Sequence, residues 1–225
     1  MISRSFITAT GTGSGKTWVA RALARSLVRA GRSVVALKPI ETGCTPDPID
    51  ALALARACAQ PALAHAPGLY RAALPLAPHA VALETGAPAP DLAELVRSVR
   101  SLASHAEHLL VEGAGGLLAP LDATHTMADL ARALELPLLL VAPDALGVLS
   151  HVLTAVESAH ARALPIAAVV LVAHAHTADA STRTNRRILA ERLDAPVLAF
   201  PHTIDDDDAL ADAAERTGLL ALLCG

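Results

Sequence analysis

The chain has 225 residues and a formal net charge of −4, and it is 53% hydrophobic but only 2% aromatic. A chain of this length is most simply one domain, predicted here over residues 1–225, with a core of Ala, Leu, Val and Ile. The acidic balance argues against a nucleic-acid partner, because such proteins concentrate Lys and Arg. The longest apolar run, Leu164–Ala173, is too short for a membrane helix.

Short apolar, β-branched runs alternate along the chain with longer stretches of helical period. The predicted strands are Ser5–Thr8, Ser33–Leu37, His108–Val111, Leu138–Val141, Ile166–Val172 and Pro196–Phe200. The predicted helices are Lys16–Ala30, Asp91–His105, Met127–Leu134, Val148–Ala161 and Ser181–Leu193. Strands that are apolar on both faces and alternate with helices indicate a parallel sheet covered on each side. The functional residues of such a sheet gather on loops at the carboxyl ends of its strands.

Three further features have weaker signals. The proline-rich segment Gln60–Pro90 is predicted to be a long loop with a short helix around Ala80–Thr85. The acidic run Asp205–Asp208 precedes ALADAAERT, so it is expected to supply charge at a helix N-terminus and not to bind metal. The three cysteines are scattered, which argues against a disulfide framework or a zinc site.

The first glycine-rich loop begins too early for a signal peptide to precede it, so we expect a cytoplasmic protein.

The first strand-to-helix loop, FITATGTGSGKT (residues 6–17), has the composition of a phosphate-binding loop. Backbone N–H groups of Gly13–Thr17 would cradle a phosphate at the helix N-terminus. Lys16 would reach the β- and γ-oxygens, and the Thr17 hydroxyl would coordinate Mg²⁺. Thr10 occupies the position of the first glycine of the usual spacing. A glycine-rich turn with a chance lysine is disfavoured by the strand before it and the helix after it.

Two other loops follow predicted strands. LKPIETG (residues 37–43) places Lys38 where it could be a second cation for a transferring phosphoryl group. VEGAGG (residues 111–116) ends a strand with Glu112, a carboxylate suited to a metal ligand. Taken alone, each is equally consistent with an exposed lysine or a simple glycine-rich turn. Together with the first loop they support one another.

These motifs, in this order, resemble those of the dethiobiotin synthetase family. IDALALA (residues 49–55), PHAVALETG (residues 78–86), LGVLSH (residues 146–151) and APVLAFP (residues 195–201) extend the resemblance over nearly the whole chain. The resemblance implies a three-layer α/β P-loop NTPase fold and an ATP-dependent cyclo-ligase of biotin synthesis. Such an enzyme converts 7,8-diaminononanoate, CO₂ (from bicarbonate) and MgATP to dethiobiotin, ADP and phosphate, through a carbamate and a carbamic-phosphoric anhydride.

The resemblance also implies roles for individual residues. Lys38 and Lys16 would be catalytic, and Mg²⁺ would be held by Thr17, Asp50 and Glu112. ATP and its metal would contact Gly13, Ser14, Gly15, Lys16, Thr17, Trp18, Asp50, Glu112, Gly113, Ala114, Gly115, His174, Pro201, His202 and Thr203. The substrate would contact Thr42, Gly113, Gly115, Leu146, Gly147, Ser150 and Asn185. Family members bind the substrate at a two-fold interface, so a homodimer is expected, with Asn185 contributed by the partner subunit.

Three positions depart from the family pattern. Ala9 replaces a glycine, Ala145 replaces a basic residue, and His174 stands where many members have an adenine-reading asparagine. These departures bear on nucleotide choice and substrate affinity. His174 and His176 have no third ligand in reach, so a metal site there is not expected.

Other P-loop proteins are the rival interpretations. A partition-type ATPase would carry a signature lysine at the position of Gly11. A helicase-like motor would need an acidic strand end and a basic surface. A small-molecule kinase is the nearest enzyme alternative, and it would not require CO₂.

Overall fold

The computed structural model describes residues 4–173 and 180–224. Its strands are β1 (Arg4–Ala9), β2 (Val34–Leu37), β3 (Ile40–Thr42), β4 (Tyr70–Ala72), β5 (His108–Glu112), β6 (Leu138–Pro143), β7 (Ile166–Val172) and β8 (Val197–Phe200). Its α-helices are α1 (Lys16–Arg29), α2 (Ile49–Ala57), α3 (Pro78–Thr85), α4 (Leu92–Leu102), α5 (Met127–Ala133), α6 (Val148–His160), α7 (Thr182–Ala190), α8 (Asp207–Arg216) and α9 (Ala221–Cys224). A short 3₁₀ helix, η1, spans Pro61–His65.

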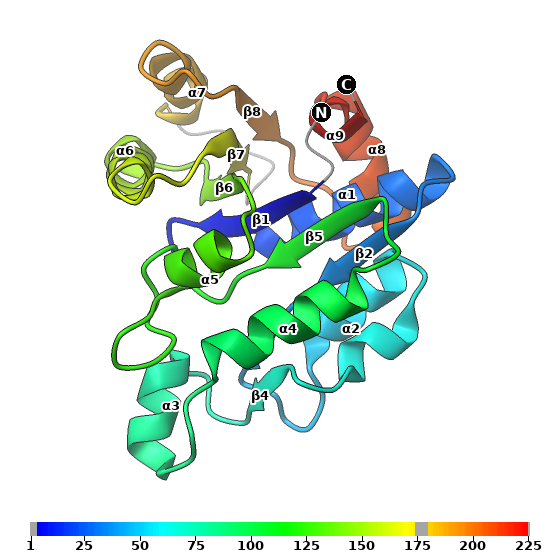
Figure 1. Cartoon of the computed structure of the whole chain (residues 1–225). Coiled ribbons are helices and arrows are strands. Elements are labelled where there is room, and N and C mark those ends of the chain that lie inside the picture. Colours follow the sequence, from blue (N-terminus) through cyan, green and yellow to red (C-terminus); the bar gives the residue numbers. More distant parts are fainter. Residues whose placement is uncertain (1–3, 174–179, 225) are drawn as a thin grey trace.

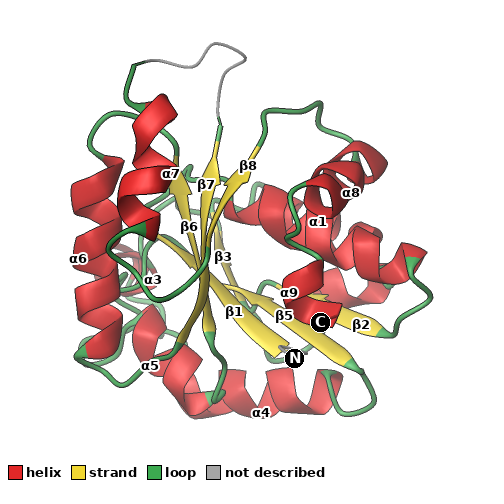
Figure 2. Ribbon diagram, turned by 90° about the horizontal axis from the view of Figure 1, so that it is seen from above, coloured by secondary structure: helices red, strands yellow, loops and turns green. Residues whose placement is uncertain are grey.

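Six strands form one parallel sheet in the order β2-β5-β1-β6-β7-β8. Side chains alternate across each strand, so Ile7 packs with α1, α2 and α8, whereas its neighbour Phe6 packs with α4 and α5. The helices α6 and α7 cover the same face as α4 and α5, over β6–β8. Figures 1 and 2 show the sheet enclosed between these two sets of helices. The fold is therefore the three-layer α/β arrangement predicted from the sequence.

Small side chains allow α1 to lie close to the sheet and to α8. Ala20, Ala22 and Ala24 of α1 and Ala213 of α8 are fully buried in one cluster. With few aromatic residues in the chain, this layer is filled mainly by alanine, leucine and valine side chains. The close packing holds α1, which begins directly after the glycine-rich loop, in a fixed position against the sheet.

All six predicted strands of the main sheet are confirmed, with bounds that differ by at most two residues at either end. The five predicted helices are also present, although α4 ends at Leu102 and α7 at Ala190, three residues before each predicted end. The prediction for Gln60–Pro90 was incomplete, because η1 and β4 lie in it as well as α3. The sequence pattern also missed α2 and β3. A three-residue strand is too short to show a period of two, and α2 is alanine-rich with a weak polar face.

The strands β3 and β4 form a separate two-stranded parallel ribbon beside the end of β2. Arg71 of β4 secures it, because its Nη1 donates to the carbonyl oxygens of Lys38 at 3.0 Å and Pro39 at 3.4 Å. Its Nη2 donates to the carbonyl of Ala64 in η1 at 3.2 Å. Burial lowers the pKa of Arg71. The ribbon thus holds the backbone that follows β2.

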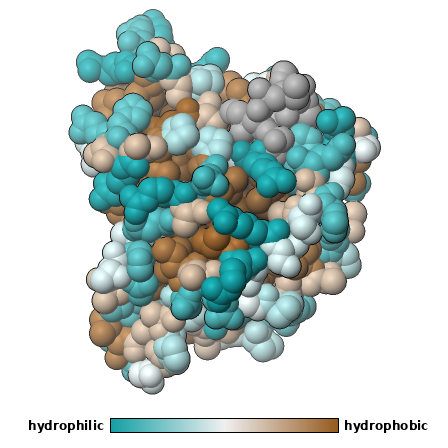
Figure 3. Space-filling view, viewed as in Figure 1, coloured by the Kyte–Doolittle hydropathy of each residue, from teal (hydrophilic) through white to brown (hydrophobic). Residues whose placement is uncertain are grey.

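No helix among the described residues is long and apolar enough to cross a membrane. Large apolar side chains nevertheless reach the surface at Leu83 of α3, at Leu118 after β5 and at Leu146 before α6. Figure 3 shows apolar surface broken up by polar side chains on the face seen in Figure 1.

Candidate active site

A cavity of about 1260 Å³ opens where the carboxyl ends of β1, β2 and β5 meet. Ligands of open α/β sheets bind at this edge. The sequence-predicted residues that line it are Gly13, Ser14, Gly15, Lys16, Thr17, Trp18, Lys38, Thr42, Asp50, Ala114, Gly115, Glu112 and His202. The fold thus brings the three motif loops, the start of α2 and the segment after β8 to one place.

The glycine-rich loop has the backbone that its sequence requires. Gly15 has φ of 89° and caps α1, and a Cβ at this position would lie 2.9 Å from a methyl group of Val172. Only glycine fits there without strain. The loop closes on itself through Ser14 Oγ and Lys16 Nζ, which donate to the carbonyl of Gly11 at 2.9 and 3.2 Å. Burial, with a further contribution from the nearby Lys38 ammonium, lowers the pKa of Lys16 to about 8.

Four polar side chains meet at the floor of the cavity. Lys38 Nζ lies 2.5 Å from Glu112 Oε1 and 3.0 Å from Asp50 Oδ2. Thr17 Oγ1 donates to the same Glu112 oxygen at 2.8 Å. Burial alone would lower the pKa of Lys38, but the Glu112 and Asp50 carboxylates outweigh it and raise that pKa above the usual lysine value. Lys38 is therefore a charged ammonium at any physiological pH.

The donors at this point fit a magnesium ion. Thr17, Asp50 and Glu112 present oxygen atoms, which magnesium prefers. Glu112 is fully buried, and its Oε2 has no hydrogen-bond partner among the described residues. A buried carboxylate oxygen without a partner is costly unless something else binds it, and a bound cation would do so.

Glu41 is a residue of this site that was not singled out from the sequence. It lies on β3, lines the cavity and is 6% exposed. Its carboxylate accepts the backbone N–H groups of Asp50 and Ala51, each at 2.9 Å. Burial raises the pKa of Glu41, and these two bonds partly oppose the rise. Its place inside the LKPIETG motif, three residues after Lys38, was the available signal, but the contact depends on β3 and α2, which the pattern did not predict.

The far end of the cavity is formed by α1 and the segment after β8. The rings of Trp18 and His202 lie 6.2 Å apart at 50° to one another. Arg21, one turn further along α1, also lines the cavity and pairs with Asp205 and Asp207 at 2.5 and 2.7 Å. The segment that includes His202 is thereby held against the start of α1.

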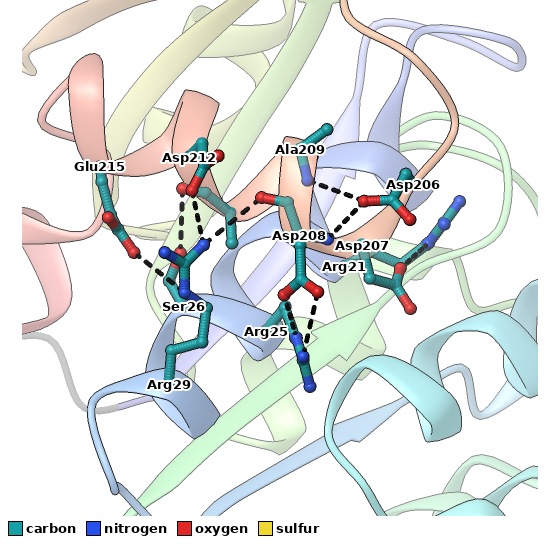
Figure 4. Close-up of polar contacts among 11 residues, drawn as sticks. Arg21, Arg25, Ser26, Arg29, Asp206, Asp207, Asp208, Ala209, Asp212 and Glu215 are labelled. Carbon is teal, nitrogen blue, oxygen red and sulfur yellow. Dashed lines mark hydrogen bonds and ion pairs between the residues drawn. The ribbon is translucent and has the colours of Figure 1, made fainter.

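The ion pairs between α1 and α8 continue along both helices (Figure 4). Arg25 pairs with Asp208 at 2.7 Å, and Arg29 pairs with Asp212 at 2.6 Å. Asp206 caps α8 by accepting the N–H groups of residues 208 and 209 at 3.0 Å. The acidic run therefore supplies charge at a helix N-terminus, as predicted.

Several predicted residues lie outside the cavity lining. Gly113, Leu146, Gly147, Ser150, Asn185, Pro201 and Thr203 are in this group, and His174 falls outside the described residues. Asn185 is 3% exposed, and its Nδ2 donates to Asp144 Oδ1 at 2.8 Å and to the Ala145 carbonyl at 3.4 Å. It thus holds the loop before α6 in its own chain. Leu146 in that loop is 85% exposed, and Gly147 is the N-cap residue of α6.

Comparison with solved structures reflects the fold alone. Chloroplast FtsY from Physcomitrella patens matches with a TM-score of 0.55 and 17% identity, over 95% of this chain and 65% of that one. The signal recognition particle receptor FtsY from Elizabethkingia anophelis matches with a TM-score of 0.54 and 14% identity, over the same shares of the two chains. The chain thus spans just under two thirds of the length of these structures.

Sequence comparison is more specific. The family model described as "AAA domain" matches residues 3–206. The ATP-dependent dethiobiotin synthetase BioD of Anaeromyxobacter dehalogenans is 46% identical over 74% of each chain. The protein of the same name from Pseudomonas aeruginosa is 39% identical over 93% of each chain. The one from Aquifex aeolicus is 36% identical over 96% of this chain and 95% of its own. The identity to these relatives extends over most of the chain, and the chain belongs to the ATP-dependent dethiobiotin synthetase family.

Proposed function

We propose that the chain catalyses the ATP-dependent conversion of 7,8-diaminononanoate and CO₂ to dethiobiotin, with release of ADP and phosphate. The observation that carries the proposal is the Thr17–Glu112–Lys38–Asp50 cluster beside the glycine-rich loop, in a chain whose relatives carry this name. Phosphate binding and phosphoryl transfer need the loop and the cations, and the cavity offers both in one place.

The chemistry proceeds in three steps. One substrate amine attacks CO₂, forms a carbamate C–N bond and loses a proton. A carbamate oxygen then attacks the γ-phosphorus of ATP, and the bond to ADP breaks to leave a carbamic-phosphoric anhydride. The second amine attacks the carbonyl carbon, expels phosphate and loses a proton, which closes the five-membered ureido ring.

The second step brings together two anions, so it requires fixed positive charge. Lys16 reaches the phosphates from the start of α1, and Lys38 approaches from the end of β2. Thr17, Asp50 and Glu112 would hold Mg²⁺, and the ion would supply positive charge that offsets the negative charge of the nucleotide phosphates. Thr42, at the cavity wall, would hydrogen-bond the substrate, and the Ala114–Gly115 backbone, which lines the cavity, would lie against substrate and phosphate.

The proposal includes a homodimer. Leu146, Gly147 and Ser150 lie outside the cavity of their own chain, at the exposed start of α6, where free N–H groups suit a carboxylate. They would receive the substrate carboxylate across the interface. Asn185 would act through the loop that it holds. A single domain over residues 1–225 and a cytoplasmic location are also part of the proposal.

Bicarbonate distinguishes this reaction from its nearest rival. A small-molecule kinase with the same cavity would phosphorylate the diamine-bearing acid without CO₂. We expect ADP release from the purified protein to require both diaminononanoate and bicarbonate. ADP release that is indifferent to bicarbonate would favour the kinase and contradict the proposal.

A further inference from the structure

A buried carboxylate lies directly behind the pair formed by Lys38 and Asp50. Glu41 projects from β3, and its Oε1 and Oε2 accept the N–H groups of Asp50 and Ala51. The first N–H groups of any helix lack partners within the helix. The residue before α2, Pro48, makes no side-chain capping bond. Glu41 takes this role and caps the helix from strand β3.

This cap determines where Asp50 lies. Both bonds are to the first turn of α2, so they fix the backbone from which the Asp50 side chain projects. That side chain is 43% exposed, and it reaches Lys38 Nζ at 3.0 Å. A half-exposed carboxylate has freedom to turn away unless its backbone is anchored.

The same ribbon also fixes the other member of the pair. Glu41 and Arg71 are register partners in the β3–β4 ladder. Arg71 binds the carbonyl oxygen of Lys38 at 3.0 Å. Adjacent positions of one short ribbon therefore anchor the ammonium and the carboxylate that face each other across the cavity floor.

We propose that Glu41 is a positioning residue, which holds Asp50 where it can bind the metal that accompanies the nucleotide. The inference rests on the proposed function, because it takes Asp50 as a ligand of that metal. A carboxylate that served only as a helix cap would contribute to stability and leave the link between metal and nucleotide binding unchanged. The two roles are separable by measurement.

The test measures the affinity of the full-length protein for a non-hydrolysable ATP analogue by calorimetry, once with Mg²⁺ and once with EDTA. The ratio of the two dissociation constants is the coupling between metal and nucleotide. Outer-shell partners of metal ligands typically contribute about 10–100-fold to metal affinity. We expect Glu41→Ala to reduce the coupling about 10-fold or more, with the affinity in EDTA unchanged. Glu41→Gln keeps one acceptor oxygen and should fall between wild type and Glu41→Ala.

A matched control is the carboxylate cap of α4. Asp91 Oδ1 accepts the N–H of Glu94 at 2.8 Å, and no α4 residue is among the described residues that line the cavity. Asp91→Ala should lower the melting temperature and leave the coupling at its wild-type value. Glu41→Gln, which preserves side-chain volume, gives the answer if Glu41→Ala does not fold.

The variant Asp50→Asn separates the assignment of Asp50 as a metal ligand from the positioning role of Glu41. If Asp50→Asn leaves the coupling unchanged, the metal assignment is wrong and the role of Glu41 falls with it. If Asp50→Asn lowers the coupling while Glu41→Ala and Glu41→Gln keep the wild-type value, the positioning role alone is overturned.

Discussion

Lys38 Nζ and Glu112 Oε1 lie 2.5 Å apart, and both side chains are buried at the floor of the cavity. They come from neighbouring strands of the sheet, from the carboxyl ends of β2 and β5. Glu112 also accepts from Thr17 in the glycine-rich loop. One carboxylate thus ties together the three loops that the sequence motifs identify, and it keeps the Lys38 ammonium charged.

Replacing Lys38 with alanine should lower turnover about 100-fold or more, because it removes a cation that stabilises the transferring phosphoryl group. Nucleotide affinity should remain largely intact, since Lys16 and the loop backbone stay in place. Turnover is measured at saturating substrate and corrected for folded protein, because Glu112 loses its buried partner. Arg100→Ala, at an exposed ion pair on α4, is the control. A near-normal rate in Lys38→Ala would remove this residue from the mechanism.

Glu112→Gln should shift the dependence of activity on Mg²⁺ to higher concentrations. The amide retains one oxygen but loses the charge that a divalent cation favours. The control is Glu107→Gln, just before the other end of the same strand, where Glu107 accepts from Ser33 N at 3.1 Å. Activity titrated against Mg²⁺ should move for the first variant and stay in place for the second. Superimposable curves for Glu112→Gln and wild type would contradict the metal assignment.

Arg21→Ala should destabilise the fold by roughly 1 kcal/mol, near the upper end for ion pairs that are partly exposed. Its side chain is only 12% exposed and binds two carboxylates. The effect should shrink in 1 M salt, because screening weakens such pairs. Arg32→Ala, whose pair with Glu107 is about half exposed, should have a smaller effect. Urea denaturation at low and high salt measures the loss of unfolding free energy in each variant. Equal losses for Arg21→Ala and Arg32→Ala would contradict a larger contribution of the Arg21 ion pairs to stability.

The sequence was sufficient for the parts of the fold that have clear periods. The six strands of the main sheet and the loops after β1, β2 and β5 follow from apolar runs and glycine motifs. The β3–β4 ribbon could not be predicted, because each strand has only three residues and β4 lies within the proline-rich segment Gln60–Pro90. The roles of Glu41 and Arg71 depend on that pairing, so they became visible only in three dimensions.

The same limit applies to residues that act through long-range contacts. The acidic run Asp205–Asp208 lies at a helix N-terminus, as its sequence context predicts, but its pairing with the arginines of α1 requires α1 and α8 to lie side by side. Asn185 was placed by resemblance at a subunit interface, and the structure adds that it holds Asp144 within its own chain. The local sequence pattern does not indicate which side chains far apart in the chain will contact each other.

Nucleobase choice should be less strict here than in family members with an asparagine at the position of His174. An amide can present a donor and an acceptor to one edge of adenine, whereas the two nitrogens of a histidine ring point in different directions. The rings of Trp18 and His202 lie 6.2 Å apart at the far end of the cavity, and we expect any stacking on a base there to be indifferent to its identity. We therefore expect CTP and GTP to support turnover. A preference of kcat/KM for ATP of about 1000-fold or more would contradict this.

The fate of the carbon of bicarbonate tests the proposed reaction most directly. The protein is incubated with MgATP, diaminononanoate and ¹³C-bicarbonate, and the product is analysed by mass spectrometry. The proposed reaction predicts dethiobiotin one mass unit heavier than the unlabelled product, with the label in the ureido carbonyl and one ADP formed for each ring closed. ATP consumption that yields a phosphorylated diamine without label would contradict it.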